Sequence, residues 1–397
     1  MNAKRFLLTW VATSLAAVLA VASFNIVADP YLFFGTPGLP GLTVLKPRLY
    51  QQVQMAKTYQ LERIKPRTLL LGNSRVEIGL DPESVKWPED YKPVFNAAFA
   101  GRNLFTAVYM LREALAVSAL KTIVVGLDFQ DFDESQTPPN MVVPVFDDER
   151  RLLVDRREKP NPDRAMQIWR DRGSATLTMD AFYDSAATLL DQHPATAVTM
   201  TPFGFNPLNE YRVFVARSGY YQLFAQRNAG NEGIYKNRPR PDFANIRQFE
   251  DFRYLEQILD IAREHNVIVL LFIHPYHSDY LEMFHRMGLW ESFENWKRAL
   301  VRVTEARHSP TVRLYDFADY SELTTEHVPP RGDTHSEMHW YWEAGHYKSA
   351  LGDELLATMF GSGRLGHQLT AATIEPVLAE IRRHREHFLA GAQQHSE

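Results

Sequence analysis

Ser74 is the residue of this chain whose setting best fits nucleophilic chemistry. It follows an apolar run, Leu69-Leu70-Leu71, and the small polar pair Gly72-Asn73. If the run is a buried strand, Ser74 lies at its carboxyl end, where parallel sheets gather ligands and catalytic groups. Gly72 permits a tight turn, and the backbone N–H of Ser74 would face an oxyanion formed at its own hydroxyl. The same residues also fit a plain helix cap by Asn73 and Ser74, so this motif alone leaves both interpretations open.

A serine nucleophile needs a base, and the best candidate is His346. Glu343 stands three residues earlier, at the start of an expected helix. From there a carboxylate can reach the imidazole and fix its tautomer, so that the other ring nitrogen accepts the serine proton. We therefore expect Ser74 as nucleophile, His346 as general base and Glu343 as the residue that orients the base. The alternative is a glutamate at a helix start beside an unrelated surface histidine.

Two other groupings of acids and histidines lie just upstream of this pair. His335 and His339, with Glu343 and His346, offer metal ligands if the segment is one continuous helix, because residues four apart share a face. A zincin motif has its glutamate directly after the first histidine, which is not the case here, and a proline-rich stretch upstream favours a loop. Asp333-x-His335 is a reserve acid–base pair. We expect no metal site and no cofactor.

Four further residues are candidates for substrate binding. His274 and His277 follow an apolar run at 267–273 and so project toward the same edge of the sheet. Ordinary loop structure is the competing interpretation for both. Arg75 and Arg102 could hold an anionic sugar acid or balance the charge of Glu343.

The elements that must position these residues are short apolar runs separated by helical patterns. Apolar stripes at helical spacing cover Asn103–Val117 and the stretch from Phe252 to Ala262. Strands that alternate with helices and are buried on both faces are typical of a parallel sheet with helices on both sides. We therefore predict an α/β fold with a three-layer sandwich. The expected strands are Thr68–Leu71, Val94–Ala97, Thr122–Gly126, Val267–Ile273 and, with a weaker pattern, Val312–Asp316.

A long interruption separates the third and fourth expected strands. It is rich in Arg, Asp, Asn and Pro, and its aromatic residues show no strand period. We expect a mainly helical cap that helps to build a substrate groove, with a passive insertion as the alternative. Its helices include Ala165–Trp169 and Thr178–Asp191. The expected divisions are an anchor at 1–28, a linker at 29–60, an α/β domain at 61–135 and 249–362 around the cap at 136–248, and a helical tail at 363–397.

The amino terminus predicts a membrane segment. Phe6–Val27 is a run of about 22 residues without charge, long enough to span a hydrocarbon core as a helix. Lys4 and Arg5 precede it, and the positive-inside rule keeps them cytoplasmic, which places the rest of the chain in a bacterial periplasm. We expect a retained, single-pass signal anchor. A cleaved signal peptide is the alternative, since Ala20-Val21-Ala22 has the small-x-small form of a cleavage site.

Composition narrows the function further. With 43 basic and 48 acidic residues among 397, the net charge is -5, so no global positive field exists to hold nucleic acid. The chain has no cysteine, which excludes disulfides, Cys-ligated zinc, iron–sulfur clusters and thiol nucleophiles together. Any nucleophile must therefore carry oxygen or nitrogen.

Four segments occur in the order of the conserved blocks of the SGNH/GDSL hydrolase superfamily. Gly72-Asn73-Ser74-Arg75 resembles the first block, where Gly-Asp-Ser is usual, and Glu343-x-x-His346 resembles the last, usually Asp-x-x-His. Asn96–Gly101 resembles the block whose glycine N–H joins the oxyanion hole. Gly126-Leu127-Asp128-Phe129 occupies the place of Gly-x-Asn-Asp. The resemblance implies an SGNH-like fold and a serine hydrolase mechanism.

One position departs from the family pattern. Asp128 stands where the oxyanion-hole asparagine is expected, and an ionised carboxylate would repel an oxyanion. The resemblance implies the N–H groups of Ser74 and Gly101 as donors. Asp128 then either turns away or is kept protonated, or the third donor comes from Asn103 or Arg75.

Five short segments sharpen the likeness: Asp29-Pro30, Lys46-Pro47, Leu289-Trp290, Trp296-Lys297-Arg298 and Trp342-Glu343-x-x-His346-Tyr347. With them the chain resembles membrane-anchored bacterial SGNH-like proteins, akin to the alginate O-acetylation proteins and the D-alanyl transfer protein of teichoic acid modification. The likeness covers roughly Leu61–Asp133 and Phe249–Phe360.

This resemblance implies an exported acyl esterase or O-acyltransferase, with acetyl as the expected acyl group. Its substrate would be a glycan or acyl ester of a cell-envelope or exported polysaccharide, and a membrane-bound acyl donor protein is an implied partner. The alternative is a non-catalytic SGNH-like component, anchored to the inner membrane, that binds or assembles glycan.

Overall fold

The computed structural model describes residues 3–132, 147–155, 157–236, 243, 252–307 and 311–394. Two units divide the chain between them. The first joins residues up to 64 with residues 145–209, and the second holds residues 65–144 and 210–397.

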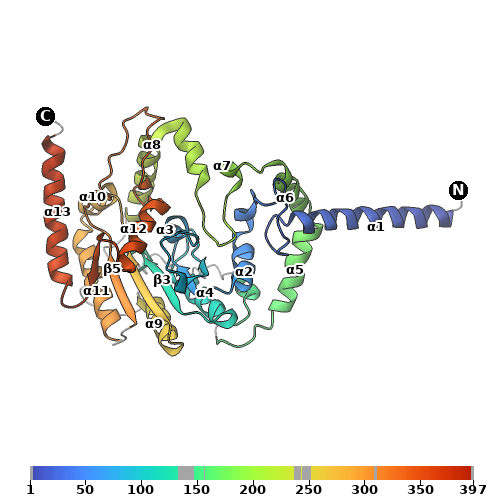
Figure 1. Cartoon of the computed structure of the whole chain (residues 1–397), viewed down its shortest axis with the longest axis horizontal. Coiled ribbons are helices and arrows are strands. Elements are labelled where there is room, and N and C mark those ends of the chain that lie inside the picture. Colours follow the sequence, from blue (N-terminus) through green and yellow to red (C-terminus); the bar gives the residue numbers. More distant parts are fainter. Residues whose placement is uncertain are drawn as a thin grey trace. The chain divides into compact units, whose positions relative to one another are not determined.

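A six-stranded sheet is the centre of the second unit, with strand order β2-β1-β3-β4-β5-β8 (Figure 1). The first five strands are parallel, and β8 pairs antiparallel with β5 at one edge. Every residue of β1 and β3 is buried, so both faces of the central sheet are covered. The strands are β1 (Thr68–Leu71), β2 (Val94–Asn96), β3 (Thr122–Leu127), β4 (Ile268–Ile273), β5 (Val312–Asp316), β6 (Tyr341–Glu343), β7 (His346–Tyr347) and β8 (His367–Leu369).

Helices connect these strands, and the prediction of an α/β fold with a parallel sheet is confirmed. β1 and β5 have the predicted bounds, and the other three predicted strands differ by one residue at one end. β8 was not predicted, because three residues at a sheet edge carry too little apolar pattern. The helices of this unit are α3 (Ser74–Gly79), η2 (Glu89–Tyr91), α4 (Leu104–Val117), η3 (Phe129–Phe132), α8 (Asn209–Tyr235), α9 (Arg253–Glu264), α10 (Ser278–Arg286), α11 (Trp290–Glu305), α12 (Ser349–Met359) and α13 (Ile374–Gln394).

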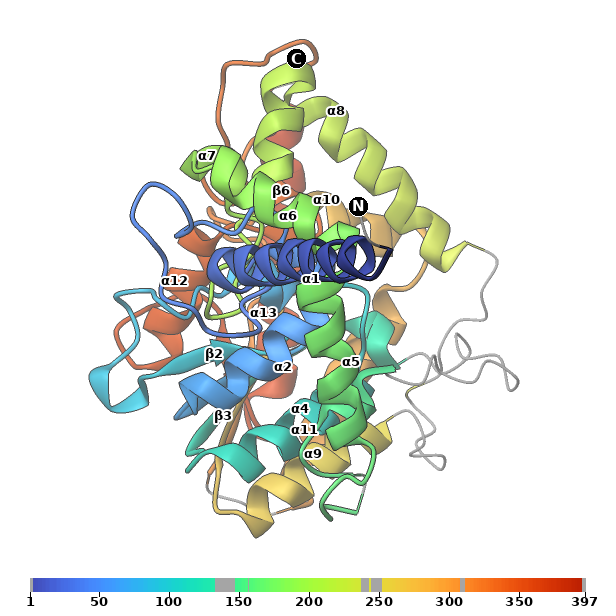
Figure 2. The same ribbon diagram turned by 90° about the vertical axis from the view of Figure 1, so that its right-hand side faces the viewer.

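The first unit is entirely helical in its described elements. They are α1 (Ala3–Ala28), η1 (Leu49–Gln52), α2 (Val53–Ile64), η5 (Asp147–Arg151), α5 (Arg164–Leu177), α6 (Met179–Leu190) and α7 (Pro194–Ala197). Figure 2 shows α1, α2 and α5 from the side of the amino terminus. The stretch expected as a linker at 29–60 is folded here, because Tyr31, Leu32 and Phe33 are buried in two apolar clusters.

The sequence predicted that residues 136–248 form a single cap, but the structure divides this stretch between the two units. Its part from 145 to 209 belongs to the first unit, together with the amino-terminal 64 residues. Of its described helices, α8 lies mainly in the second unit. The physical reason is that α5 and α6 find their packing partner in α1. The parts of the expected cap at 136–146, 156, 237–242 and 244–248 lie outside the described residues.

Helix α1 is long and apolar enough to cross a membrane, and among the described residues it is the one helix that is so. Most of its length is exposed, and its last turn is built into the first unit through the buried residues Asn25 and Ala28. This helix is consistent with a signal anchor or a signal sequence.

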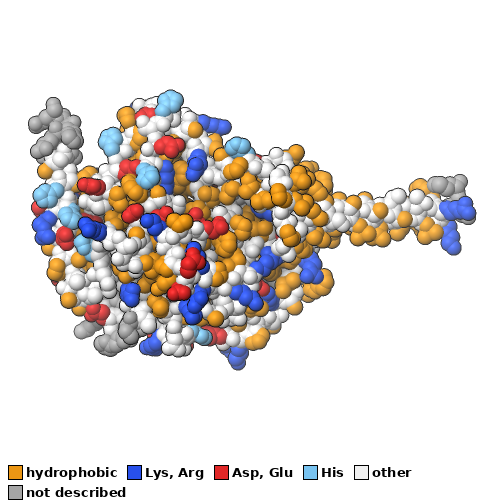
Figure 3. All heavy atoms as spheres, viewed as in Figure 1, with side chains coloured by type: hydrophobic (Ala, Val, Ile, Leu, Met, Phe, Trp, Pro, Cys, Tyr) orange, Lys and Arg blue, Asp and Glu red, His pale blue; other side chains and the backbone are white. Residues whose placement is uncertain are grey.

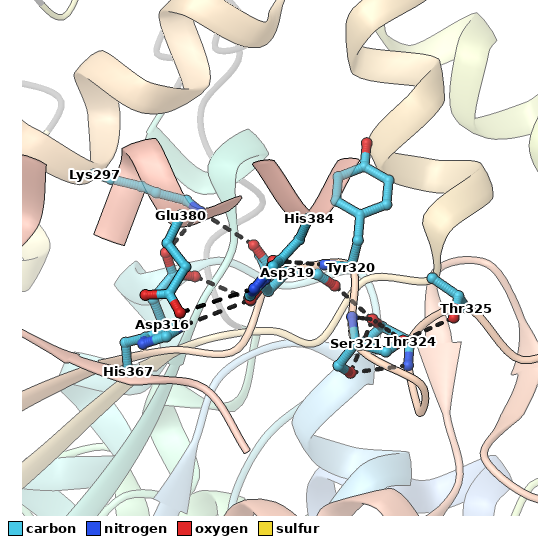
Figure 4. A network of polar contacts seen from close by, with 11 residues as sticks. Lys297, Asp316, Asp319, Tyr320, Ser321, Thr324, Thr325, His367, Glu380 and His384 are labelled. Carbon is cyan, nitrogen blue, oxygen red and sulfur yellow. Dashed lines mark hydrogen bonds and ion pairs between the residues drawn. The ribbon is translucent and has the colours of Figure 1, made fainter. Parts of the chain in front are cut away.

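A polar network fixes the carboxyl-terminal helix to the sheet edge (Figure 4). Asp319 accepts hydrogen bonds from His384 at 2.8 Å and from His367 at 3.5 Å. Burial alone would raise the pKa of the Asp319 carboxyl, but these two bonds outweigh it and lower the pKa. The bond to Asp319 in turn raises the pKa of His367. Beside them, the fully buried Lys297 and Asp316 form an ion pair at 2.6 Å. The network ties α11, β5, β8 and α13 together.

Helix α3, which begins at Ser74, is held by two close contacts that only glycine allows. A Cβ atom on Gly79 would lie 2.1 Å from the Tyr347 ring, and one on Gly352 would lie 1.9 Å from the Gly79 carbonyl oxygen. The carbonyl is backbone and cannot move aside without moving α3. The position of Ser74 therefore depends on close packing of α3 against β7 and α12.

We expect Gly352→Ala to destabilise the protein by about 1–3 kcal/mol, the usual cost of overpacking. The midpoint of urea unfolding should fall. Gly230→Ala is the matched control, because nothing lies within 4 Å of a Cβ atom at that position of α8. Equal midpoints for both variants would contradict the close contact between α12 and α3.

Candidate active site

Ser74 lies at the turn between β1 and α3, at the carboxyl edge of the sheet. Gly72 has φ of 146°, and a Cβ atom there would lie 2.6 Å from Val76 Cγ2, so the turn requires glycine. The Asn73 side chain caps α3 by accepting a hydrogen bond from the Arg75 backbone N–H at 3.0 Å. Asn73 is thus the cap, which leaves the partly exposed Ser74 hydroxyl available to another partner.

That partner is His346, which lies 272 positions further along the chain. Ser74 Oγ and His346 Nε2 are 2.8 Å apart. The other ring nitrogen of His346, Nδ1, contacts Glu343 Oε1. His346 is partly exposed, whereas Glu343 is buried. Nucleophile, base and orienting acid of the sequence-based hypothesis thus lie in one hydrogen-bonded row whose hydroxyl end reaches solvent.

A β-hairpin, rather than the expected helix, brings Glu343 and His346 together. Glu343 ends β6, His346 begins β7, and the two residues are opposite each other across a two-residue turn of Ala344 and Gly345. Spacing of three residues therefore brings the side chains together across strands instead of along a helix face. Aromatic residues on both sides of a short Ala-Gly pair are the sequence signal for this hairpin.

The environment keeps Glu343 ionised. Burial alone would raise the pKa of this carboxyl, but the contact with His346, the Gly345 N–H bond at 2.8 Å and the nearby Arg75 outweigh it. The pKa of Glu343 consequently lies below its usual value. An ionised carboxylate at Nδ1 favours the tautomer whose Nε2 can accept a proton from Ser74.

Arg75 and Asp128 form a buried ion pair behind the candidate nucleophile. The guanidinium also donates to Tyr280 Oη at 3.2 Å and lies over the Tyr276 ring at 5.2 Å. Asp128 accepts further hydrogen bonds from Asn73 Nδ2 at 3.0 Å and from Tyr276 Oη at 2.9 Å. Neither tyrosine was predicted from the sequence, although the aromatic residues that follow β4 were a signal for them.

The contacts of this cluster show that Asp128 turns away from the position of an oxyanion. Both of its carboxylate oxygens accept hydrogen bonds inside the protein, so the side chain is turned into the core and offers no donor to an oxyanion. Asn103 caps α4 with its side-chain oxygen, which accepts from the Phe105 N–H at 3.2 Å. Because this bond uses only the acceptor, the Asn103 Nδ2 group stays a candidate donor. The other candidate donors are the backbone N–H groups of Ser74 and of Gly101, which lies in an exposed turn.

Three of the four residues expected to bind substrate are buried, which corrects that expectation. Arg75 is paired with Asp128. His277 is engaged at both ring nitrogens, by the Glu326 carbonyl at 2.7 Å and the Asp279 N–H at 3.2 Å. His274 is fully buried, and burial, together with the charges of Arg75 and His346, keeps its pKa well below the usual value. Arg102 is partly exposed and stays a candidate.

The alternative groupings upstream do not assemble. Asp333 accepts hydrogen bonds from the backbone N–H groups of His335 and Ser336, so it closes a turn instead of orienting the His335 ring. His335 and His339 are exposed and lie in a loop, not on a continuous helix. Over the described part of the chain, no group of three or more metal-ligating side chains could hold a metal ion.

Helix α8 supports the hairpin that carries the base. Tyr211 packs edge-on against Trp342 with ring centroids 6.3 Å apart, and Lys348 donates to Tyr220 Oη at 2.8 Å. The exposed Arg212 lies over the Trp342 ring at 5.7 Å. Trp342, which precedes Glu343 in the chain, thus contacts an aromatic and a basic side chain of α8. The sequence alone did not indicate these contacts.

Comparison with known proteins adds no relative. No family model matches the chain, and no curated protein matches it significantly. A functional conclusion therefore depends on the geometry of the site, above all on the contacts among Ser74, His346 and Glu343.

We expect Asp128→Asn to destabilise the protein by about 3–5 kcal/mol, because Arg75 would keep a buried charge without its partner. Urea unfolding measures the stability loss.

The double variant Arg75→Met with Asp128→Asn is the control, since it removes both charges and should recover a large part of the loss. If Asp128→Asn alone unfolds at the same urea concentration as the parent protein, the ion pair does not carry the stability assigned to it.

Proposed function

We propose that this protein is a serine-dependent acyl esterase or O-acyltransferase with an SGNH-like three-layer fold. The observation that carries the proposal is the 2.8 Å contact between Ser74 Oγ and His346 Nε2, with Glu343 at the other ring nitrogen. A hydroxyl, an imidazole and a buried carboxylate in this order form the arrangement that activates serine for acyl transfer.

In the first half-reaction, Ser74 Oγ attacks the carbonyl carbon of an acyl ester while its proton passes to His346 Nε2. Glu343 stabilises the imidazolium that forms. The N–H groups of Ser74 and Gly101 face the oxyanion of the tetrahedral intermediate. His346 then gives the proton to the leaving alcohol oxygen as the carbon–oxygen bond breaks, and an acyl-serine is left.

The second half-reaction decides between the two activities. If water attacks the acyl-serine and gives its proton to His346, the outcome is hydrolysis. If a sugar hydroxyl attacks in the same way, the acyl group is transferred. In either case the bond between the carbonyl carbon and Ser74 Oγ then breaks, and His346 returns the proton to Ser74 Oγ. Both routes use the same three side chains, and neither needs a cofactor.

The proposed location and substrate follow from α1 and from the resemblance of the motifs. With Lys4 and Arg5 on the cytoplasmic side, a retained α1 would place both units in the periplasm of a bacterium. An acyl ester, with acetyl as the expected group, on a cell-envelope or exported glycan is the substrate class we propose there. A membrane-bound acyl donor protein is the proposed partner.

One observation favours a second function. Asp128 stands where the superfamily pattern has an asparagine that donates to the oxyanion, and its carboxylate accepts hydrogen bonds and pairs with Arg75 instead. The loss of this donor fits a non-catalytic, anchored component that binds or assembles glycan. The intact hydrogen-bonded row from Ser74 to Glu343 weighs against it, because a binding protein has no need for an oriented base beside a serine.

Ser74→Ala should reduce turnover of p-nitrophenyl acetate by roughly 10⁶-fold, the effect of removing an activated nucleophile. A fluorophosphonate probe should label the parent protein and not the variant. Ser336→Ala is the control, because this serine contacts Asp333 in an exposed loop and should leave labelling unchanged. A parent protein that neither turns over ester nor reacts with the probe would leave the binding function as the better proposal.

Glu343→Gln should lower turnover by about 10⁴-fold while leaving Ser74 in place, because a neutral amide no longer selects the required tautomer of His346. Circular dichroism checks that the variant is folded. Glu337→Gln changes an exposed acid of the same segment and should retain full activity. Comparable rates for the two variants would remove Glu343 from the mechanism.

A further inference from the structure

Helix α6 of the first unit has its apolar and polar faces reversed. Its buried face consists of small and hydroxyl side chains, Ala181, Ser185 and Thr188. Its exposed face carries Met179, Tyr183 and Leu190, which follow one another at helical spacing. Tyr183 is 63% and Leu190 87% exposed. A helix that faces water usually exposes polar side chains and buries apolar ones. The exposed apolar face of α6 therefore suits an apolar environment.

Helix α5 repeats the same reversal. The charged residue Asp171 is buried and accepts hydrogen bonds from Arg151 at 2.6 Å and from Tyr59 at 2.8 Å. The opposite face exposes large apolar side chains: Met166, Trp169 and Leu177. Arg172 lies over the Trp169 ring at 4.9 Å. Exposed tryptophan next to arginine is typical of helices at the boundary between membrane and water.

These faces continue the apolar surface of α1. Phe182 of α6 packs against Phe24 of α1 with ring centroids 5.5 Å apart, and Asn25 donates to the Thr176 carbonyl of α5 at 2.9 Å. Figure 3 shows hydrophobic side chains gathered at the base of α1, and in Figure 1 α5 runs across the axis of α1. The loop that follows α1 also exposes large apolar side chains: Leu39, Leu42 and Val44.

The length of α1 determines where the apolar faces of α5 and α6 lie relative to the hydrocarbon core of a membrane that α1 spans. From Arg5 to Phe24 a helix rises about 29 Å at ~1.5 Å per residue, close to the ~30 Å of a hydrocarbon core. Phe24 therefore lies where the hydrocarbon ends, and Phe182 lies against it. The exposed faces of α5 and α6 are then at the level of the lipid headgroups.

We propose that α5 and α6 form a lipid-docking surface, which lies on the outer leaflet around the point where α1 leaves the membrane. The inference rests on the proposed retention of α1 as an anchor. A lipid surface is favoured over a protein partner because the apolar faces are continuous with α1 and carry arginine and tryptophan at their rim.

Because the chain has no cysteine, one introduced cysteine can carry an environment-sensitive nitrobenzoxadiazole (NBD) label. Full-length Leu190→Cys and Tyr183→Cys are labelled and reconstituted into vesicles of phosphatidylethanolamine and phosphatidylglycerol. Val85→Cys is the matched control, since Val85 is 89% exposed and lies in the other unit. Phosphatidylcholine with a nitroxide at carbon 5 of the acyl chain then serves as the quencher.

Labels at 183 and 190 should show blue-shifted emission and lose at least about half of their intensity with nitroxide lipid, while the label at 85 stays unquenched. Labels at 183 and 190 that behave like the label at 85 would overturn the docking surface. A blue shift without quenching would also overturn it, because protein and not lipid would then cover α6.

Carbonate extraction of the same vesicles separates this inference from the proposed anchor. Protein that stays in the membrane with unquenched labels at 183 and 190 contradicts the docking surface alone. Protein that is extracted contradicts the retained anchor and the docking surface together. Ester turnover of the labelled variants should equal that of the parent, because neither position belongs to the candidate active site.

Discussion

The positive charge of Arg75 lies in the core, next in sequence to the candidate nucleophile, and its neutralisation organises the site. Asp128 at the end of β3 supplies the opposing charge, and Tyr276 and Tyr280 supply polar edges and ring faces. A buried charge without a partner would cost several kcal/mol, so these elements are held in one arrangement. The turn that presents Ser74 is part of it, since Asn73 donates to the same carboxylate.

The same constraint gives a physical reason for an acid at position 128, where the pattern that the motifs resemble has asparagine. A carboxylate can neutralise Arg75 and an amide cannot, but a carboxylate cannot donate to an oxyanion. Under the proposed function, oxyanion stabilisation then depends on the backbone N–H groups of Ser74 and Gly101 and on Asn103 Nδ2. Arg75 also helps to hold the pKa of Glu343 below its usual value, so one cation supports both the turn and the acid.

The two units use apolar side chains in different ways. In the second unit they are buried among the strands and helices, as at Phe129, Phe293 and Trp296, whose rings contact one another. In the first unit, α5 and α6 bury an aspartate, a serine and two threonines and expose methionine, tryptophan, tyrosine and leucine. A unit with this reversal suits two surroundings at once, water on one side and lipid on the other.

Sequence alone determined the local features whose signal is short in range. The parallel strands, the helices α4, α9 and α13 and the apolar α1 were all predicted, because apolar periodicity depends on neighbours along the chain. The catalytic roles of Ser74, His346 and Glu343 are a proposal that starts from their residue types and their contacts. Tertiary structure decided what depends on distant residues. It placed residues 29–60 and 145–209 in one unit, made a hairpin of the segment from Glu343 to His346, and buried Arg75, His274 and His277. The unit that joins 29–60 with 145–209 and the buried partners of Arg75 and His277 depend on contacts between separate segments: Arg75 and Asp128 are 53 positions apart, and His277 and Glu326 are 49 apart. No local pattern encodes which distant side chain will neutralise a charge or cover a face.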